Sequence, residues 1–399
     1  MHRCARIVSF TSLLLLAECA SAPPGDAERV AAINADKRRA AVQIEAGEYA
    51  AAVRTLESLA TDAPRDDQVF TMLGDAQRGL GEFDAAIRGY EQAIRINYGD
   101  YLPHLKLGTW LMENGKTGRA LTEFEVAVKF GNDDPLTHYN YGLALHELGR
   151  RDEALAQWRI ARDLDPRNAD IMEAVGIGLT GVDDQAAIAS FADAEKLGKK
   201  TAAFFNNYAL ALERAGEHAR AESYFIAAAA ADDGREEYRL NLALHYMRVA
   251  NYQDASVAFE QLIAARGARW SWSVYLARAY VELGRFDEAL AALDPFRAEI
   301  EAGRLAPDSD RVDRVPPTVA EALSAAGLAW RGRREFARSR ECLARAVALD
   351  PGEPSHLNNY GVVLAESGML AEARAQWKRV LEIDPRNATA RANLSAYER

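Results

Sequence analysis

The stretch "YNYGLALHELGRRDEALAQW", residues 139–158, returns further along the chain as "NNYGVVLAESGMLAEARAQW", residues 358–377. Eleven of the twenty positions are identical, from Asn140/Asn359 to Trp158/Trp377. Two such similar stretches so far apart in one chain indicate an internal repeat, so weaker copies are expected between them.

A glycine followed five residues later by a small residue marks these copies. The strong copies have their glycines at Gly47, Gly81, Gly115, Gly149, Gly216, Gly284 and Gly368, and the first four of these are evenly spaced. Weaker copies, recognised by Ala187, Ala255 and Ser339, bring the predicted number of repeats to ten. Six periods of about 34 residues, with one residue missing near 181–184 and sixteen extra near 297–317, account for the distance between the two near-identical stretches.

Each unit predicts a pair of helices. In the fourth unit, the first helix is expected from Pro135 to about Leu148 and the second from about Arg151 to Leu164. Gly149 supplies the left-handed residue that ends the first helix. Gly142 and Ala154 are small, so the two helices can approach closely. Bulky residues are expected to fill the seam between the helices at one equivalent place: Tyr90, Phe124, Trp158, Phe191, Phe225, Phe259 and Trp377.

Prolines mark the ends of the second helices. Pro166 in "DLDP" and Pro385 in "EIDP" prevent the helix from continuing. Together with the regularly recurring small residue, glycine turn, alanine and aromatic residue, this pattern resembles the tetratricopeptide repeat over about residues 33–385. The resemblance implies an all-α fold, a right-handed α-solenoid of about ten helix hairpins whose first helices line a concave groove.

The repeats leave little room for other domains. The sequence predicts repeats one to eight over 33–296, an inserted loop over 297–317, repeats nine and ten over 318–385, and a capping helix over 386–399. Residues 23–32 are predicted to be a linker. The prolines and aspartates in the second half of the insertion predict an irregular segment, which is either a partner contact or a tolerated insertion.

The first twenty-two residues have the three parts of an export signal: a positive start, an apolar stretch and small residues. "LAEC", residues 16–19, resembles a bacterial lipoprotein signal in which Cys19 is acylated, although Glu18 departs from that pattern. Cleavage after Ala22 is the alternative. The sequence therefore predicts an exported, periplasmic protein, attached to the outer membrane if Cys19 carries a lipid; Cys342 is then the only free cysteine.

Composition and motifs argue against several functions. A net charge of −11 and the lack of a run of Lys and Arg that would make a basic face argue against nucleic acid as a partner. The spacing of cysteines and histidines does not suit a metal site. "GIGLTG", residues 176–181, follows no predicted strand, so it is interpreted as a chance match to a nucleotide loop. We expect no enzyme, no cofactor and no metal.

One column of residues is unusual in the predicted groove. Asn140, Asn207, Asn241 and Asn359 share the sixth place of their repeats, although asparagine is a poor helix former. Asparagines at this place line the groove of the sugar-nucleotide protein-glycosylating enzymes that resemble this chain, and there they hold a peptide backbone. The alternative is that the amides bond only within the array. Three neighbouring residues complete the predicted partner site: Tyr139, Tyr275 and Arg278.

The sequence therefore predicts a non-catalytic interaction scaffold of the bacterial cell envelope that binds an extended peptide or protein in its groove. The alternative is an assembly factor that uses its convex or loop surfaces. Lipid-anchored tetratricopeptide proteins resembling this one serve pilus assembly, secretion or outer-membrane biogenesis. The fold does not identify a pathway, and the oligomeric state is open.

Overall fold

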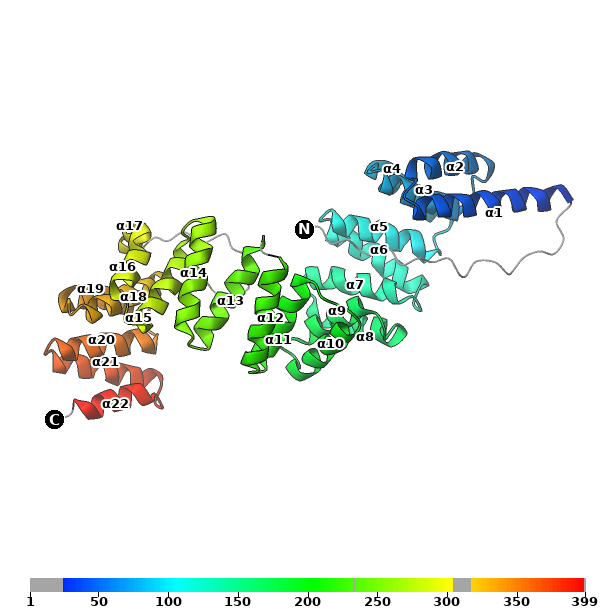
Figure 1. Ribbon diagram of the computed structural model, residues 1–399. Helices are drawn as coiled ribbons and strands as arrows, with labels where there is room; N and C mark the ends of the chain where they lie inside the picture. The colour runs from blue at the N-terminus through cyan, green and yellow to red at the C-terminus, as the bar shows by residue number, and fades with distance from the viewer. Residues whose placement is uncertain (1–23, 233, 304–316, 398–399) are drawn as a thin grey trace. The chain divides into compact units, whose positions relative to one another are not determined.

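The computed structural model describes residues 24–232, 234–303 and 317–397, and all the regular elements in these ranges are helical (Figure 1). This confirms the predicted all-α fold. The predicted signal peptide with Cys19, and residues 304–316 of the predicted insertion, lie outside the described residues. The chain divides into two compact units, residues 1–199 and 200–399, and each is considered by itself.

The first unit consists of five antiparallel hairpins, each made of two consecutive helices. Its helices are α1 (Pro24–Glu45), α2 (Tyr49–Asp62), α3 (Asp67–Gly79), α4 (Phe83–Ile96), α5 (Tyr101–Glu113), α6 (Thr117–Phe130), α7 (Pro135–Glu147), α8 (Arg151–Leu164), α9 (Ala169–Leu179) and α10 (Asp184–Lys196).

The second unit contains five further hairpins and a final single helix. Its elements are α11 (Ala202–Arg214), α12 (His218–Ala231), α13 (Glu236–Arg248), α14 (Tyr252–Arg266), α15 (Trp270–Glu282), α16 (Phe286–Leu293), the 3-10 helix η1 (Asp294–Phe296), α17 (Arg297–Ala302), α18 (Val319–Gly332), α19 (Phe336–Leu349), α20 (Pro354–Glu366), α21 (Leu370–Ile383) and α22 (Ala388–Ala396). The ten predicted repeats correspond to the ten hairpins of the described residues.

The fourth repeat shows why these residues form a hairpin. The observed bounds of α7 and α8 agree with the predicted ones to within one residue. Asp134 caps α7 by accepting a hydrogen bond from the backbone N–H of Leu136 at 3.2 Å, which satisfies a donor that the first turn leaves open. Gly149 has φ of +79°, which confirms its predicted role as the left-handed residue of the turn.

Close packing of an aromatic residue on a small one holds seven of the ten described hairpins together, and a leucine takes the same place in the other three. A Cβ added to Gly142 would lie 2.4 Å from Nε1 of Trp158, and one added to Gly361 would lie 2.4 Å from Nε1 of Trp377. The predicted seam residues are buried in both units: Tyr90, Phe124, Trp158, Phe191, Phe225, Phe259 and Trp377. The recurring sequence pattern is therefore the pattern of the core.

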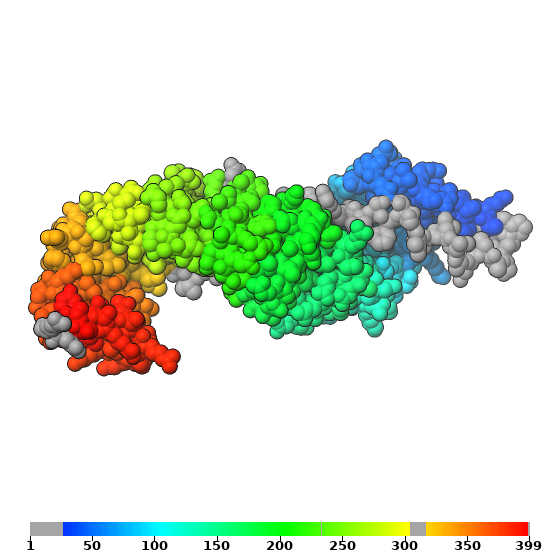
Figure 2. All heavy atoms as spheres, turned by 60° about the horizontal axis from the view of Figure 1, so that its bottom comes forward, coloured from blue at the N-terminus to red at the C-terminus, as the bar shows by residue number. Residues whose placement is uncertain are grey.

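Stacking of neighbouring repeats completes the core. Within each unit, a second helix packs on the first helix of the next repeat, as α2 does on α3 and α14 on α15. First helices also contact one another directly, as α5 and α7 do in one unit and α18 and α20 in the other. In the space-filling view, the repeats of the second unit follow one another without a gap (Figure 2). A single hairpin could not bury its apolar faces without these neighbours.

The predicted insertion follows an interrupted second helix. α16 is only eight residues long, and the chain continues through η1, which contains Pro295, into α17. Ile300 of α17 is buried in the same core cluster as Trp272 of α15. The first part of the insertion is therefore packed helix rather than loop.

The described C-terminal end is covered by α22. Tyr397, which follows this helix, stacks its ring on Trp377 with the centroids 5.4 Å apart. Among the described residues, no helix is both long enough and apolar enough to cross a membrane.

Candidate functional site

The first helices of the repeats form the surface on which the sequence predicts that a partner binds. Places are counted within each repeat, so that Pro135 is the first place of the fourth repeat and Asn140 is the sixth. The fifth and sixth places are adjacent, and the ninth follows them by four and three residues, so the three side chains lie on one side of the first helix. We call these three places, taken over successive first helices, the first-helix face. In the second unit this face comes from α11, α13, α15, α18 and α20.

Two of the four predicted asparagines join neighbouring repeats. Asn241 of α13 donates from Nδ2 to Oδ1 of Asn206 in α11 at 2.8 Å, and both side chains are buried. Asn359 of α20 donates to Oγ of Ser324 in α18 at 3.5 Å. Each bond links the sixth place of one repeat to the fifth place of the repeat before it, 35 residues earlier.

The other two asparagines behave differently. Asn140 donates from Nδ2 to the backbone carbonyl of Leu136, one turn back in its own helix, at 2.8 Å. The Asn207 side chain is half-buried and, among the described residues, makes no hydrogen bond. The amide column therefore includes three members that bond within the array and one whose amide is available to a partner.

The ninth place of the second unit is largely apolar. It is occupied in order by Leu210, Leu244, Arg278, Leu328 and Val362. Leu210, Leu328 and Val362 are half-buried, and Leu244 is buried. The exception, Arg278, is exposed and forms an ion pair with Glu321 at 3.4 Å. The second unit thus combines apolar side chains with amides, and its single cation at this place is already paired.

The predicted tyrosines belong to this face. Tyr275 stacks on Phe259 with the rings 5.6 Å apart and nearly parallel, and the guanidinium of Arg278 lies 5.8 Å from the Tyr275 ring. Tyr139 is half-buried in the first unit, and its backbone carbonyl accepts a hydrogen bond from Nε1 of Trp158 at 3.2 Å. The structure brings Tyr275 and Arg278 together, whereas Tyr139 and Asn140 belong to the other unit.

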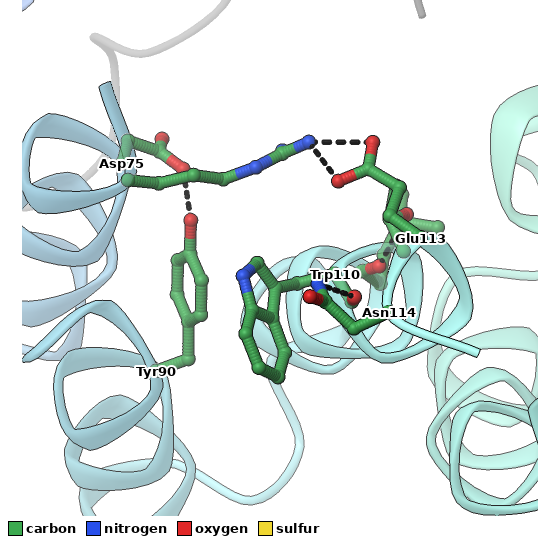
Figure 3. Close-up of polar contacts among 8 residues, drawn as sticks. Asp75, Tyr90, Trp110, Glu113 and Asn114 are labelled. Atoms are coloured by element: carbon green, nitrogen blue, oxygen red, sulfur yellow. Dashed lines mark hydrogen bonds and ion pairs between the residues drawn. The ribbon is translucent and has the colours of Figure 1, made fainter. Parts of the chain in front are cut away.

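A second contact between repeats lies further along the first helices. Arg78 at the end of α3 donates to both carboxylate oxygens of Glu113 in α5, at 2.7 and 2.6 Å (Figure 3). Arg331 of α18 likewise contacts both carboxylate oxygens of Glu366 in α20, donating from Nε to one and from Nη2 to the other. Both pairs link the twelfth place of one repeat to the thirteenth place of the next, again 35 residues apart.

Between α3 and α5 the first unit has a charged pair, whereas the second unit has an amide pair between α11 and α13. Asp75, at the ninth place of α3, pairs with Lys106, at the sixth place of α5, at 2.8 Å. The hydroxyl of Tyr90 donates to Asp75 at 2.9 Å (Figure 3). Burial, with the nearby Asp75 carboxylate as the second cause, raises the pKa of Tyr90 well above its ordinary value. This phenol therefore stays protonated and keeps the Asp75 carboxylate in place.

The residues that hydrogen-bond to two of the amides were not among the predicted site residues. Asn206 and Ser324 both stand at the fifth place, and a search for polar residues one repeat and one position apart would have paired them with Asn241 and Asn359. The described residues contain no group of His, Cys, Asp and Glu side chains that could hold a metal ion. The arrangement suits the contact of an extended chain through hydrogen bonds and apolar side chains.

The stacked hairpins and their shared face define a class: a helical repeat scaffold for protein interaction. Models of the tetratricopeptide repeat match residues 38–101, 71–135, 240–304 and 323–388, and a second tetratricopeptide model matches 135–159. The chain belongs to the tetratricopeptide repeat family, whose members bind proteins and peptides. The matched ranges leave out residues 160–239, where α9 to α12 nevertheless form hairpins.

Solved structures share the repeats at low identity. A crystal structure of MamA is 23% identical, covers 40% of this chain and 95% of that one, and has a TM-score of 0.37. PilF of Pseudomonas aeruginosa is 18% identical over 54% of this chain and 99% of that one, with a TM-score of 0.46. YrrB, described as a TPR protein with an unusual peptide-binding site, is 17% identical over 48% and 97%, with a TM-score of 0.42. No curated protein matches the chain.

Proposed function

We propose that this protein is an exported, non-catalytic scaffold that binds an extended segment of a partner protein on the first-helix face of its second unit. The observation that carries the proposal is the combination at this face of an apolar ninth-place column with Asn207, whose amide has no partner among the described residues. An amide can donate to a carbonyl and accept from an N–H of a peptide backbone at once. The leucines and valine supply contact area for apolar side chains of that peptide.

The charges near this face favour an uncharged partner segment. Arg278 is paired with Glu321, and Arg331 with Glu366, so the cations next to the apolar column are already neutralised by carboxylates. A charged segment would have to displace these pairs. We therefore expect binding to depend only weakly on ionic strength, because it does not rest on net charge.

The predicted location is part of the proposal. The first twenty-two residues have the pattern of an export signal, and Cys19 stands where a lipoprotein would be acylated. Replacing Cys19 by Ser should release the protein from the membrane fraction to the soluble periplasmic fraction. If the unaltered protein is already soluble, with a mature end after Ala22, the lipid anchor is wrong and export is retained.

Photocrosslinking in intact cells tests the partner surface. A photoreactive residue at Leu210 or Leu328 should link the protein to the same partner, and the linked peptides should map to one contiguous partner segment. The matched control carries the photoreactive residue at Ser223, an exposed residue of the second helix α12. Crosslinks from Ser223 alone would place the partner on the second-helix surface and contradict the proposal.

A further inference from the structure

The turn between α18 and α19 gathers arginines in a chain whose net charge is −11. The stretch "RGRREFARSR", residues 331–340, contains five arginines and one glutamate. We call Arg331, Arg333, Arg334, Arg338 and Arg340 the arginine edge. No unbroken run of Lys and Arg stands out here, because Gly332, Glu335, Phe336, Ala337 and Ser339 separate the arginines.

An aromatic side chain orders two of these arginines. The guanidinium of Arg338 lies 4.6 Å from the ring centroid of Trp330, and that of Arg333 lies 5.4 Å from it. Cation–π contact with an indole holds a guanidinium in place without satisfying its N–H donors. Both groups therefore remain able to donate hydrogen bonds outward.

The structure itself shows that carboxylates fit this edge. Glu366 takes two hydrogen bonds from Arg331, and Arg333 pairs with Asp287 at 2.5 Å. Glu335 pairs with both Arg333 and Arg338, at 3.4 and 3.1 Å. The Asp287 side chain is 77% exposed. The exposed pairs with Asp287 and Glu335 contribute little stability, so an incoming carboxylate can replace them at small cost.

Two members of the edge have no carboxylate partner among the described residues. Arg340 donates to Sδ of Met369 at 3.4 Å, and the exposed Arg334 makes no ion pair. Five guanidinium groups thus face three carboxylates, which leaves an excess of positive charge at this one place. An excess of donors and of charge is what an acidic ligand requires.

Arg334 occupies a place that favours glycine. Its φ is +61°, and the corresponding turn residues Gly149, Gly284 and Gly368 have φ between +72° and +80°. A left-handed conformation is unfavourable for an arginine and not for a glycine. Packing does not explain an arginine here, because the side chain is exposed.

We propose that the arginine edge docks an acidic segment of a partner protein, rich in Asp and Glu. Planar guanidinium groups match the fork of a carboxylate and accept it through paired hydrogen bonds. A protein is favoured over a nucleic acid because the chain as a whole is acidic and repels a long phosphate backbone. Docking at the arginine edge does not depend on binding at the first-helix face, so it would remain if no partner bound that face.

Binding of a labelled acidic peptide to the full chain tests the proposal. The probe is a fluorescein-labelled peptide of about twelve residues that alternates Glu and Ser, followed by anisotropy at low salt. The variant R334G/R340Q removes the two arginines that lack a carboxylate, and we expect it to weaken binding about five- to tenfold. R334G alone should weaken binding while melting no lower than the parent, because glycine relieves the backbone at this turn. If R334G binds the peptide as tightly as the parent, Arg334 does not contact the ligand and the proposal fails.

A matched control tests whether peptide binding depends on the arginine edge or only on the total positive charge of the chain. R54Q/R88Q removes two exposed arginines of α2 and α4 that have no ion-pair partner among the described residues, and it should leave affinity within about twofold. An equal loss in that control would overturn the proposal, since any removal of positive charge would then suffice. Tighter binding of an oligodeoxythymidylate of equal charge, lost in R334G/R340Q, would also overturn it by assigning the edge to nucleic acid.

Discussion

The two units stack their repeats by the same device and differ in what their first helices present. The contact between Arg78 and Glu113 in the first unit recurs between Arg331 and Glu366 in the second, at the same places of the repeat. Nearer the start of the first helices, the contacts between neighbouring repeats differ between the two units. The first unit joins α3 to α5 by the charged pair Asp75–Lys106, and the second joins α11 to α13 by amides.

This difference separates stacking from recognition. A contact that appears in both units serves what both units must do, which is to hold successive first helices in register. Side chains of the described residues that make no polar contact between repeats, such as that of Asn207, are free to serve a partner. The ninth place of the second unit is apolar except at Arg278. In the first unit it is occupied in order by Ala41, Asp75, Thr109, Leu143 and Ile177, so only two large apolar residues stand there. Recognition of an uncharged segment is therefore expected chiefly in the second unit.

The largest expected effect comes from removing the same aromatic residue in each unit. Trp158→Ala and Trp377→Ala each delete a buried indole that packs on a glycine, so each should destabilise its own repeats by about 3–5 kcal/mol. Hydrogen exchange should show faster exchange near the substituted repeat and unchanged protection in the distant unit, because each repeat contacts only its neighbours. Uniform loss of protection over both units would contradict the repeat-by-repeat account.

The sequence predicted the aromatic seam well because each seam residue lies within one repeat. Gly142 and Trp158 belong to the two helices of one hairpin, and their pairing follows from that hairpin alone. The amide column was harder, because Asn241 bonds to Asn206 across repeats. Periodicity identifies which residues share a column, but not whether a side chain faces the neighbouring repeat or a partner. That choice depends on the spacing of first helices, which only the structure provides.

The amides of the second unit should separate stability from binding. Asn241→Ala leaves Oδ1 of Asn206 buried without its donor, which should cost about 1–3 kcal/mol of folding stability. Asn207→Ala removes no hydrogen bond that the described residues make, so stability should stay the same or rise slightly. Partner affinity should fall by about 0.5–1.5 kcal/mol in Asn207→Ala. Chemical denaturation and titration with the crosslinked partner segment measure the two effects.

The control for the amide experiment is Asn140→Ala, which changes the same place in the first unit. Asn140 donates only to its own helix, so its loss should affect neither partner affinity nor repeat stacking strongly. If Asn207→Ala destabilises the chain and leaves affinity unchanged, the whole amide column is structural.

Buried histidines differ in their hydrogen-bond partners, and burial shifts the pKa of one of them, His356. In the first unit, Nδ1 of His104 and of His138 each lie 2.7 Å from a side-chain oxygen, that of Glu123 or Gln157. In the second unit His356 is buried with both ring nitrogens unpartnered among the described residues. Burial is the main cause that lowers the pKa of His356, against the opposing carboxylates of Glu353, Asp350 and Glu321.

The sign of the effect follows from that lowered pKa. Above about pH 6.5, the ordinary value for histidine, His356 is neutral in both the folded and the unfolded chain. As pH falls below that value, the unfolded chain takes up a proton that the folded chain resists, so stability of the C-terminal repeats should fall by at most about 1.4 kcal/mol per pH unit. His356→Gln should flatten this dependence between pH 7 and 5. An unchanged slope would assign it to other groups.

The smallest expected effect tests whether the shared ion pairs are equal in the two units. The side chains of Arg78 and Glu113 are 30% and 34% exposed, and those of Arg331 and Glu366 are 39% and 28% exposed. Pairs this open to solvent are screened, so each double-mutant cycle to Ala should give a coupling energy of about 0.2–1 kcal/mol. The coupling should shrink further when salt is added, because screening then acts over a shorter distance.

Reversing both charges of one pair, as in R78E/E113R, should recover most of the stability that either single reversal loses, since stacking needs opposite charges and not their order. The same reversal at Arg331 and Glu366 should also recover stability, because this pair joins the same two places of neighbouring repeats. Partner binding at the apolar column should be unaffected if these pairs serve stacking alone. Loss of binding in R331E/E366R with stability recovered would mean that this pair contacts the partner, and the division between stacking and recognition would then fail in the second unit.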